Sequence, residues 1–405
     1  MSTQQIQPPT AVPAAAPAEA GTPMLSRMVE GLSGRYRSIP VLLVLALIWV
    51  YFYSQNSAFL TSGNITTLTL QIVTTAILAL GVVFVLLVGE IDLSSAMLSG
   101  VCATVTAQLA IKSEWPLWVA ILGGVAVGVA FVGAEVLAII FGVPSLIVTL
   151  GGMVILQGLL LVVLPPEFAI NVAGTDYAKI SSTYIPSGWS LALGAAGWLI
   201  FCATRYRTHR ERESGTSPLV PVGVPALVSG VVIFGSIAVL SEGPGLPLPV
   251  LILVGMLLIA AYFTGRTRYG THLYAVGGNR EAAQRAGIPV SRMVIYSFLV
   301  LGVCAAVAGM VEASRLLAVS NSSGGGPLML NAIAAAVVGG VSLFGGRGTV
   351  WAALLGALVI GSINNGVQLL GLSTEVQSFA TGGVLILAVA IDVVITRGSL
   401  LPNRR

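Results

Sequence analysis

The sequence predicts an all-α, polytopic transmembrane helical bundle with about twelve spans. Hydrophobic residues make up 56% of the chain and charged residues only 8%, whereas a soluble domain carries about a quarter charged residues. The mean hydropathy is +0.95. Between the apolar runs, the basic residues form short separate clusters, which is a membrane-topology pattern rather than a nucleic-acid-binding one. We therefore expect a bundle embedded in membrane lipid, with no nucleic-acid partner.

The two ends of the chain differ from the rest. Residues 1–38 are rich in Ala, Pro, Gln, Ser and Thr, which predicts a disordered cytoplasmic tail. The first apolar run, 39–53, has no small-residue cleavage pattern after it, so it reads as a span rather than a removed signal. We expect a transmembrane domain over residues 39–397 and a second cytoplasmic tail over 398–405.

The apolar runs are long enough, or nearly so, to cross a hydrocarbon layer of ~30 Å. Alternating them with the N-terminus inside leaves only Lys112, Lys179 and Arg315 in outside loops, and all other Lys and Arg residues lie inside. This asymmetry places both termini in the cytoplasm. The runs are centred near Leu45, Ala76, Thr104, Val127, Val154, Ala196, Ile233, Leu257, Gly302, Val337, Gly361 and Leu387.

Two stretches leave the span count between about ten and twelve. Residues 89–92 separate the second and third runs without a proper loop, so they form either a tight cytoplasmic turn or a broken helix inside the bundle. Residues 327–348 are rich in small residues and are compatible with a re-entrant segment. Irregular backbone at membrane depth must be shielded by protein or line a wet cavity.

The concentrated polar segment of the chain is residues 274–292. Asn279 can cap a helix by accepting from its first free N–H groups, and Glu281 then sits where the helix dipole favours an acid. Gly287 supplies a left-handed stop, and Pro289 follows it. A helix of about two turns is too short to be stable alone in water. It is either a helix that docks on a soluble partner or an ordinary charged loop with a helical turn.

Candidate catalytic or cofactor chemistry is sparse. A phosphate-binding loop needs a lysine after its glycines, and the two lysines, Lys112 and Lys179, do not follow a glycine. His209 and His272 lie in separate polar loops, and Cys102, Cys202 and Cys304 lie in apolar runs without metal-ligand spacing. We therefore predict no metal, no cofactor and no enzymatic activity for this chain.

Acidic residues inside or beside apolar runs are functional candidates because a charge in the membrane costs a few kcal/mol. They are Glu90, Asp92, Glu135 and Asp392. Glu90 and Asp92 rank first because of the adjacent glycine break; either could cap a half-helix, pair with an arginine or line a pathway. For Asp392 we favour an interfacial pair with Arg397, and Glu135 could pair with a residue of another helix.

Neutral amides within spans suit a sugar, since an amide offers both a donor and an acceptor to hydroxyl groups. The candidate pathway residues of this type are led by the adjacent pair Asn364 and Asn365. Hydrogen bonding across helices is the alternative role. Further amides of this type are Gln71, Gln157 and Gln368.

Several stretches, in order and spacing, resemble the permease subunits of ABC importers, most of all the sugar branch that contains the ribose and xylose permeases. The resemblance covers roughly residues 40–396. The most telling stretch is GGNREAA at 277–283, followed by AGI at 286–288. The others are ALG at 79–81, GEIDLS at 89–94, VPSLIVTL at 143–150, NAIAA at 331–335 and GGVSLFGG at 339–346.

This resemblance implies a bacterial inner-membrane importer built from two copies of the chain, an ABC ATPase subunit and an extracytoplasmic sugar-binding protein. The additional helical pair at 190–240, with its basic loop, is similar to that of the xylose permeases and favours D-xylose or another pentose. The outside loop 165–188 is long enough to meet the binding protein. The residues implied to couple the ATPase to the spans are Gly277, Gly278, Asn279, Arg280, Glu281, Ala282, Ala283 and Gly287.

The candidate translocation path comprises Glu90, Asp92, Asn364 and Asn365. An ion-coupled secondary transporter, using Glu90 or Asp92 as its ion carrier, is the competing hypothesis. A branched-chain amino acid ABC permease is a nearer alternative, and a membrane scaffold without transport is a weaker one.

Overall fold

The computed structural model describes residues 39–212 and 222–400. The tail predicted at 1–38 and residues 401–405 lie outside the described part. A helix is present at each of the twelve predicted apolar runs. These helices are α2 (Ile39–Gln55), α3 (Ser62–Leu87), α4 (Ser95–Ala107), α5 (Leu117–Ile140), α6 (Ser145–Val163), α8 (Ser187–Arg212), α9 (Val224–Ser241), α10 (Leu248–Arg266), α13 (Val290–Leu316), α14 (Leu328–Val338), α15 (Trp351–Leu369) and α16 (Thr374–Leu400).

Eight of these helices in the described part are long and apolar enough to cross a membrane: α3, α5, α6, α8, α9, α10, α13 and α15. The others are shorter or less apolar. The predicted polytopic helical bundle is confirmed, and its twelve apolar segments are all helical. Helix α16 ends at Leu400, within the stretch predicted as a tail from residue 398.

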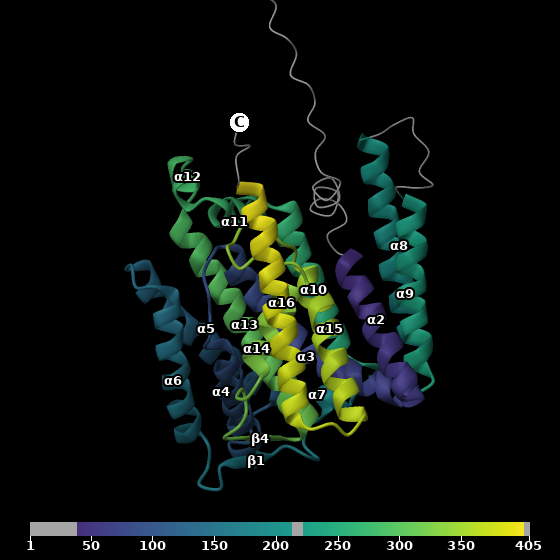
Figure 1. Cartoon of the computed structure of the whole chain (residues 1–405). Helices are drawn as coiled ribbons and strands as arrows, with labels where there is room; N and C mark the ends of the chain where they lie inside the picture. Colours follow the sequence, from purple (N-terminus) through teal and green to yellow (C-terminus); the bar gives the residue numbers. More distant parts are fainter. Residues whose placement is uncertain (1–38, 213–221, 401–405) are drawn as a thin grey trace, which may run out of the picture. The chain divides into compact units, whose positions relative to one another are not determined.

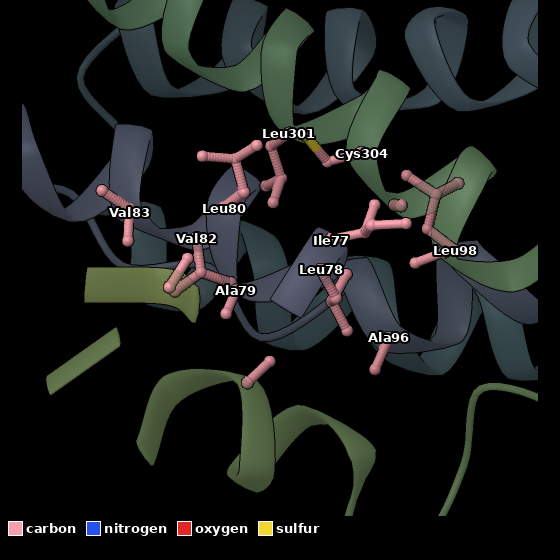
Figure 2. Packing of buried hydrophobic residues seen from close by; sticks show 14 of the residues in the cluster. Ile77, Leu78, Ala79, Leu80, Val82, Val83, Ala96, Leu98, Leu301 and Cys304 are labelled. Atoms are coloured by element: carbon pink, nitrogen blue, oxygen red, sulfur yellow. The ribbon is translucent and has the colours of Figure 1, made fainter. Parts of the chain in front are cut away.

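Helix α3 lies at the centre of the bundle and packs against α13, α14 and α15. Its residues from Ala76 to Leu87 are all buried. Figure 2 shows Ile77 and Leu80 of α3 facing Leu301 and Cys304 of α13. Gly81 permits this approach, because a Cβ atom there would press on Leu301 and Cys304. Close backbone packing at small residues is the usual means of helix association in membranes.

A non-helical break separates α3 from α4. Residues 88–94 are non-helical, and Glu90 and Asp92 within them are buried. Helix α4 is only about 20 Å long and continues as a π-helical turn, Gln108–Lys112. The connection is therefore irregular backbone whose two acidic side chains are shielded by protein, and both alternatives stay predictions. Helix α14 is also short, about 16 Å, as a re-entrant segment would be.

The bundle has two distinct ends (Figure 1). At one end, two short antiparallel ladders join loops: β1 (Ala169–Asn171) pairs with β4 (Ala318–Ser320), and β2 (Tyr184–Ile185) pairs with β3 (Leu246–Pro247). At the other end lie α11 (Arg268–Gly278) and α12 (Arg280–Arg285), near the end of α16. Between β1 and β2 lies the one-turn helix α7 (Lys179–Ser182), and a 3₁₀ turn (Ser57–Leu60) follows α2.

Candidate functional site

The polar segment 274–292 folds as the end of α11 followed by α12. The Asn279 side-chain oxygen accepts from Ala282 N–H at 2.9 Å, and Gly287 adopts a positive φ of 79°. The predicted cap and stop are both present. The residues before the cap are helical and not a loop, because 274–278 form the last part of α11. Leu273 and Val276 of α11 are buried. Burial of that apolar face holds a helix that would be marginal by itself.

Helix α12 has one face against the bundle and one face in solvent. Ala283 is buried, whereas Glu281, Ala282 and Arg285 are exposed. Glu281 and Arg285 form an exposed pair at 3.4 Å, of the kind that contributes little to stability. The outer face therefore remains available to another protein and offers both charge and small side chains.

The start of α12 is joined to the bundle through glycines that we call the glycine junction, comprising Gly89, Gly277, Gly345 and Gly346. A Cβ atom at Gly277 would collide with Leu87 O and Gly346 N. The Gly346 N–H donates to Leu87 O at 3.1 Å. Three backbone segments, from the α3–α4 connection, the α11–α12 corner and the α14–α15 loop, therefore touch directly.

Arg280 adds a charged link beside the junction. Its Nη1 lies 2.7 Å from Glu90 Oε1 across 190 residues of sequence. The Glu90 side chain is 10% exposed and that of Arg280 is 54% exposed. A charge-assisted bond of this length between a nearly buried acid and a half-exposed base ties the first residue of α12 to the break between α3 and α4.

Two residues further on, Asp92 organises the beginning of α4. Its Oδ1 accepts from Ser94 N–H at 3.2 Å and its Oδ2 from Ser95 N–H at 2.9 Å, as a capping carboxylate does at a helix N-terminus. Ile91 N–H donates to Ser145 Oγ at 3.3 Å, at the first residue of α6. The break is thus fastened to α4, α6 and α12.

Helix α4 passes this connection on to α14. The Ser95 hydroxyl lies 3.4 Å from the sulfur of Met329, and a side chain at Gly324 would collide with Ala96 O. Continuous contacts therefore run from α12 through Glu90 and Asp92 to the point where α4 meets the start of α14.

The predicted site residues fall into two groups. The coupling candidates, Glu90 and Asp92 lie together at the α12 end. Of the roles that the sequence left open for the two acids, Glu90 pairs with an arginine and Asp92 caps a half-helix. A role in the translocation path remains a prediction for both. The side chain of Asp392 lies outside the described set.

The amide candidates lie elsewhere, where α15 meets α3 and α16. Asn365 exchanges two hydrogen bonds with Asn64, at 2.9 and 3.1 Å, and Asn364 accepts from the Thr381 hydroxyl at 3.3 Å. Gln71 donates to Gln368 at 3.2 Å. These are the cross-helix bonds considered as an alternative, and they do not test whether the same amides also meet a substrate.

Sequence reasoning did not identify the Arg280–Glu90 bond, the contact of Gly277 with Gly346, or Ser94 and Ser145 as partners. The glycine pairs 277–278 and 345–346 are evident in the sequence, but nothing in either stretch indicates that it contacts the other. Among the described residues, no group of three or more His, Cys, Asp or Glu side chains is placed to hold a metal ion.

The fold and this site define a class of protein: a multi-pass membrane permease of the ABC-importer type, which presents a short capped helix at one end of its bundle. The chain belongs to the family described as "Branched-chain amino acid transport system / permease component", which it matches over residues 64–389. That range includes the glycine junction, α12 and all the amides described above.

Curated relatives agree with this assignment. The chain is 33% identical to the xylose transport system permease protein XylH of Escherichia coli, over 86% of this chain and 89% of the relative. It is also 33% identical to XylH of Haemophilus influenzae, covering 87% and 95%. The D-allose transport system permease protein AlsC of Escherichia coli is 31% identical, covering 87% and 91%. No solved structure matches the chain significantly.

The family assignment distinguishes between the hypotheses that the sequence left open. The chain is a permease component of a transport system, so it is a transport subunit rather than an enzyme. An ion-coupled secondary transporter and a scaffold without transport are not favoured.

Proposed function

We propose that this chain is the membrane-spanning subunit of an ATP-driven sugar importer, with D-xylose or a related pentose as substrate. Two of the three relatives above are named as xylose permeases and the third as an allose permease. The additional helical pair predicted at 190–240, which favours a xylose-type permease, is present as α8 and α9. The family description names branched-chain amino acids, so an amino acid is the competing substrate class.

The observation that carries the proposal is the attachment of α12. The end of α11, just before α12, touches two other backbone segments at the glycine junction, and Arg280 of α12 bonds Glu90. The outer face of α12, with Glu281 and Ala282, is exposed. An ATPase bound to that face would move α12. The glycine junction and the Arg280–Glu90 bond would then transmit this motion to α4. A bundle that binds the ATPase at one end and the binding protein at the other can switch between two states, because each partner can favour one of them.

The distribution of charge supports the orientation. Lys179 and Arg315 lie beside the strand pairs, whereas Arg280 and Arg285 lie at the α12 end. By the positive-inside rule, we propose that α12 lies in the cytoplasm, with the ATPase, and that the strand pairs lie outside. The outside end has a hollow of about 350 Å³ whose lining includes Glu114, Trp115 and Asp176. This surface, with the exposed side chains of Glu114 and Trp115, is the proposed contact for the sugar-binding protein.

The translocation path is assigned to the surface where α3 meets α15. Gln368 is exposed there, and Gln71 has a carbonyl oxygen that is buried without a hydrogen-bond partner. An exposed amide on a membrane-facing helix is better covered by a second copy of the chain around a wet path than by lipid. The path would then lie between two permease chains, with Asn364 and Asn365 in its wall.

Uptake by reconstituted vesicles tests the proposal. Vesicles with the chain, its ATPase and its binding protein should take up labelled D-xylose on addition of ATP, and excess unlabelled pentose should compete where leucine does not. Glu281→Arg should insert normally yet abolish uptake, because it reverses the charge on the exposed face of α12. Uptake without the ATPase would refute the coupling mechanism, and competition by leucine alone would refute the sugar assignment.

A further inference from the structure

A buried group that the coupling contacts do not use is Glu135 on α5. Its side chain is 5% exposed and projects between α4 and α6. Its Oε2 lies 3.1 Å from the Ser94 hydroxyl, and the same hydroxyl lies 2.7 Å from Asp92 Oδ1. Its other oxygen, Oε1, is buried without a hydrogen-bond partner and lies against Gly152 of α6.

The cluster has too few hydrogen-bond donors for both acids to be ionised. Ser94 has one hydroxyl proton, which it can donate to only one of the two acids. Asp92 already accepts from two backbone N–H groups, so the negative charge has a natural place there. A second charge on Glu135 would have no donor at Oε1, and burying an uncompensated charge is costly. None of the ion pairs found in the described part of the chain includes Asp92 or Glu135.

We propose that the Asp92–Ser94–Glu135 cluster is a proton-binding site, in which one bound proton fastens α4 to α5. The proton resides on Glu135 Oε2, which donates to Ser94 Oγ, and the Ser94 hydroxyl donates to Asp92 Oδ1. The cluster then carries a single negative charge, shared with the N–H groups at the start of α4. When Ser94 moves away from Glu135, the acid loses its acceptor, and on exposure to water it releases the proton to solvent.

The surrounding helices supply no other charge to the cluster. Helix α6 contains no Asp, Glu, Lys, Arg, His or Cys. On α13 the charged residues Arg292, Glu312 and Arg315 lie near the two ends, and Arg292 is exposed. The other titratable side chains of α13 are Tyr296 and Cys304. On α4 the one titratable side chain is Cys102, two turns beyond Ser94. Asp92 is therefore the charged group that faces Glu135.

The site is placed to respond to α12. Asp92 is two residues from Glu90, which bonds Arg280 of α12. A displacement of α12 would therefore pull on the segment that carries Asp92 and Ser94. This consequence for transport depends on the proposed function, whereas the bound proton itself does not.

Infrared spectroscopy of the purified full-length chain in lipid nanodiscs tests the proton directly. The carbonyl stretching band of a protonated carboxylic acid should be present at neutral pH in the wild type and absent from Glu135→Gln. It should disappear as the pH is raised. Absence of the band from the wild type at neutral pH would overturn the proposal, whatever the transport activity.

Thermal unfolding distinguishes a protonated acid from a charged one. An amide mimics a protonated carboxyl and can donate to Ser94, so Glu135→Gln should melt at the wild-type temperature, while Glu135→Ala should melt lower. Equal losses in the two variants would overturn the proposal. If added sodium or potassium raised the melting temperature of the wild type but not of Glu135→Gln, the ligand would be a metal cation, which also overturns it.

Gly152 provides a second pair of variants. A methyl group at Gly152 would collide with Glu135 Oε1, whereas a Cβ atom at Gly151 would meet nothing within 4 Å. Gly152→Ala should shift the infrared band and lower the melting temperature, and Gly151→Ala should do neither. Identical behaviour of the two alanine variants would contradict the position assigned to Glu135.

Discussion

Arg280 Nη1 lies 2.7 Å from Glu90 Oε1, and this bond joins the first residue of α12 to the break between α3 and α4. The pairs Lys179–Asp176, Arg285–Glu281 and Arg315–Glu312 join side chains only three or four residues apart in sequence. The Arg280–Glu90 bond lies beside the glycine junction. It can therefore resist sliding of α12 along the α3–α4 connection, whereas the backbone contacts resist a closer approach of the two segments. We therefore predict a mechanical role for this charge pair, which charge exchange can test.

Exchanging the two charges should separate coupling from folding. Glu90→Arg or Arg280→Glu alone should lower ATP-dependent uptake, because each leaves like charges in contact. The double exchange should recover part of the activity. Since Arg280 is half-exposed, we expect a coupling free energy of only about 1 kcal/mol in a double-mutant cycle on thermal unfolding. Additive effects in the cycle would show that the two side chains do not interact.

The glycine junction offers a matched pair of alanine variants. Gly277→Ala places a methyl group into Leu87 O and Gly346 N, whereas Gly278→Ala meets nothing within 4 Å. Overpacking should cost Gly277→Ala about 1–3 kcal/mol in unfolding free energy and reduce uptake. Gly278→Ala should stay near the wild type in both measurements. Equal tolerance of the two substitutions would show that the segments do not touch in the membrane.

The sequence predicts the helices well because each signal is local. Apolar runs separated by polar clusters locate the twelve segments, and Asn279 and Gly287 mark the ends of α12 by their own backbone and side-chain chemistry. The cap needs only Ala282, three residues away.

The site is less predictable because its bonds join distant parts of the chain. Asn64 and Asn365 are 301 residues apart, and each looks like an ordinary polar residue in an apolar helix. The sequence indicates that Glu90 is costly to bury, but it does not indicate which of the many arginines pairs with it. That follows only from the way α11 and α12 fold back on α3. The glycine pairs signalled close packing without naming the surfaces that pack.

Removing the Asn279 cap should loosen α12 without unfolding the bundle. Asn279→Ala loses the acceptor for Ala282 N–H and should cost the local helix about 1 kcal/mol, whereas Asn279→Asp should retain the cap. Amide hydrogen exchange in residues 280–286 should accelerate roughly fivefold in the alanine variant, since 1.4 kcal/mol corresponds to tenfold, and stay unchanged across α3. Faster exchange throughout α3 would mean that the cap supports the whole bundle instead.

The amides between α3 and α15 provide the test of the translocation path. Gln71→Leu and Gln368→Leu each remove a group that can bond sugar hydroxyls, and both should lower uptake while leaving stability nearly unchanged. A single interhelical hydrogen bond in a membrane is worth only about 0.6 kcal/mol, so the 3.2 Å bond between them cannot account for a large loss of stability. Gln157→Leu is the matched control, because Gln157 is an exposed amide on α6, which packs on α4 and α5 instead. It should leave uptake unchanged. If all three leucine variants transported sugar equally well, the path would lie on another face of the bundle; if Gln157→Leu alone failed, it would run along α6.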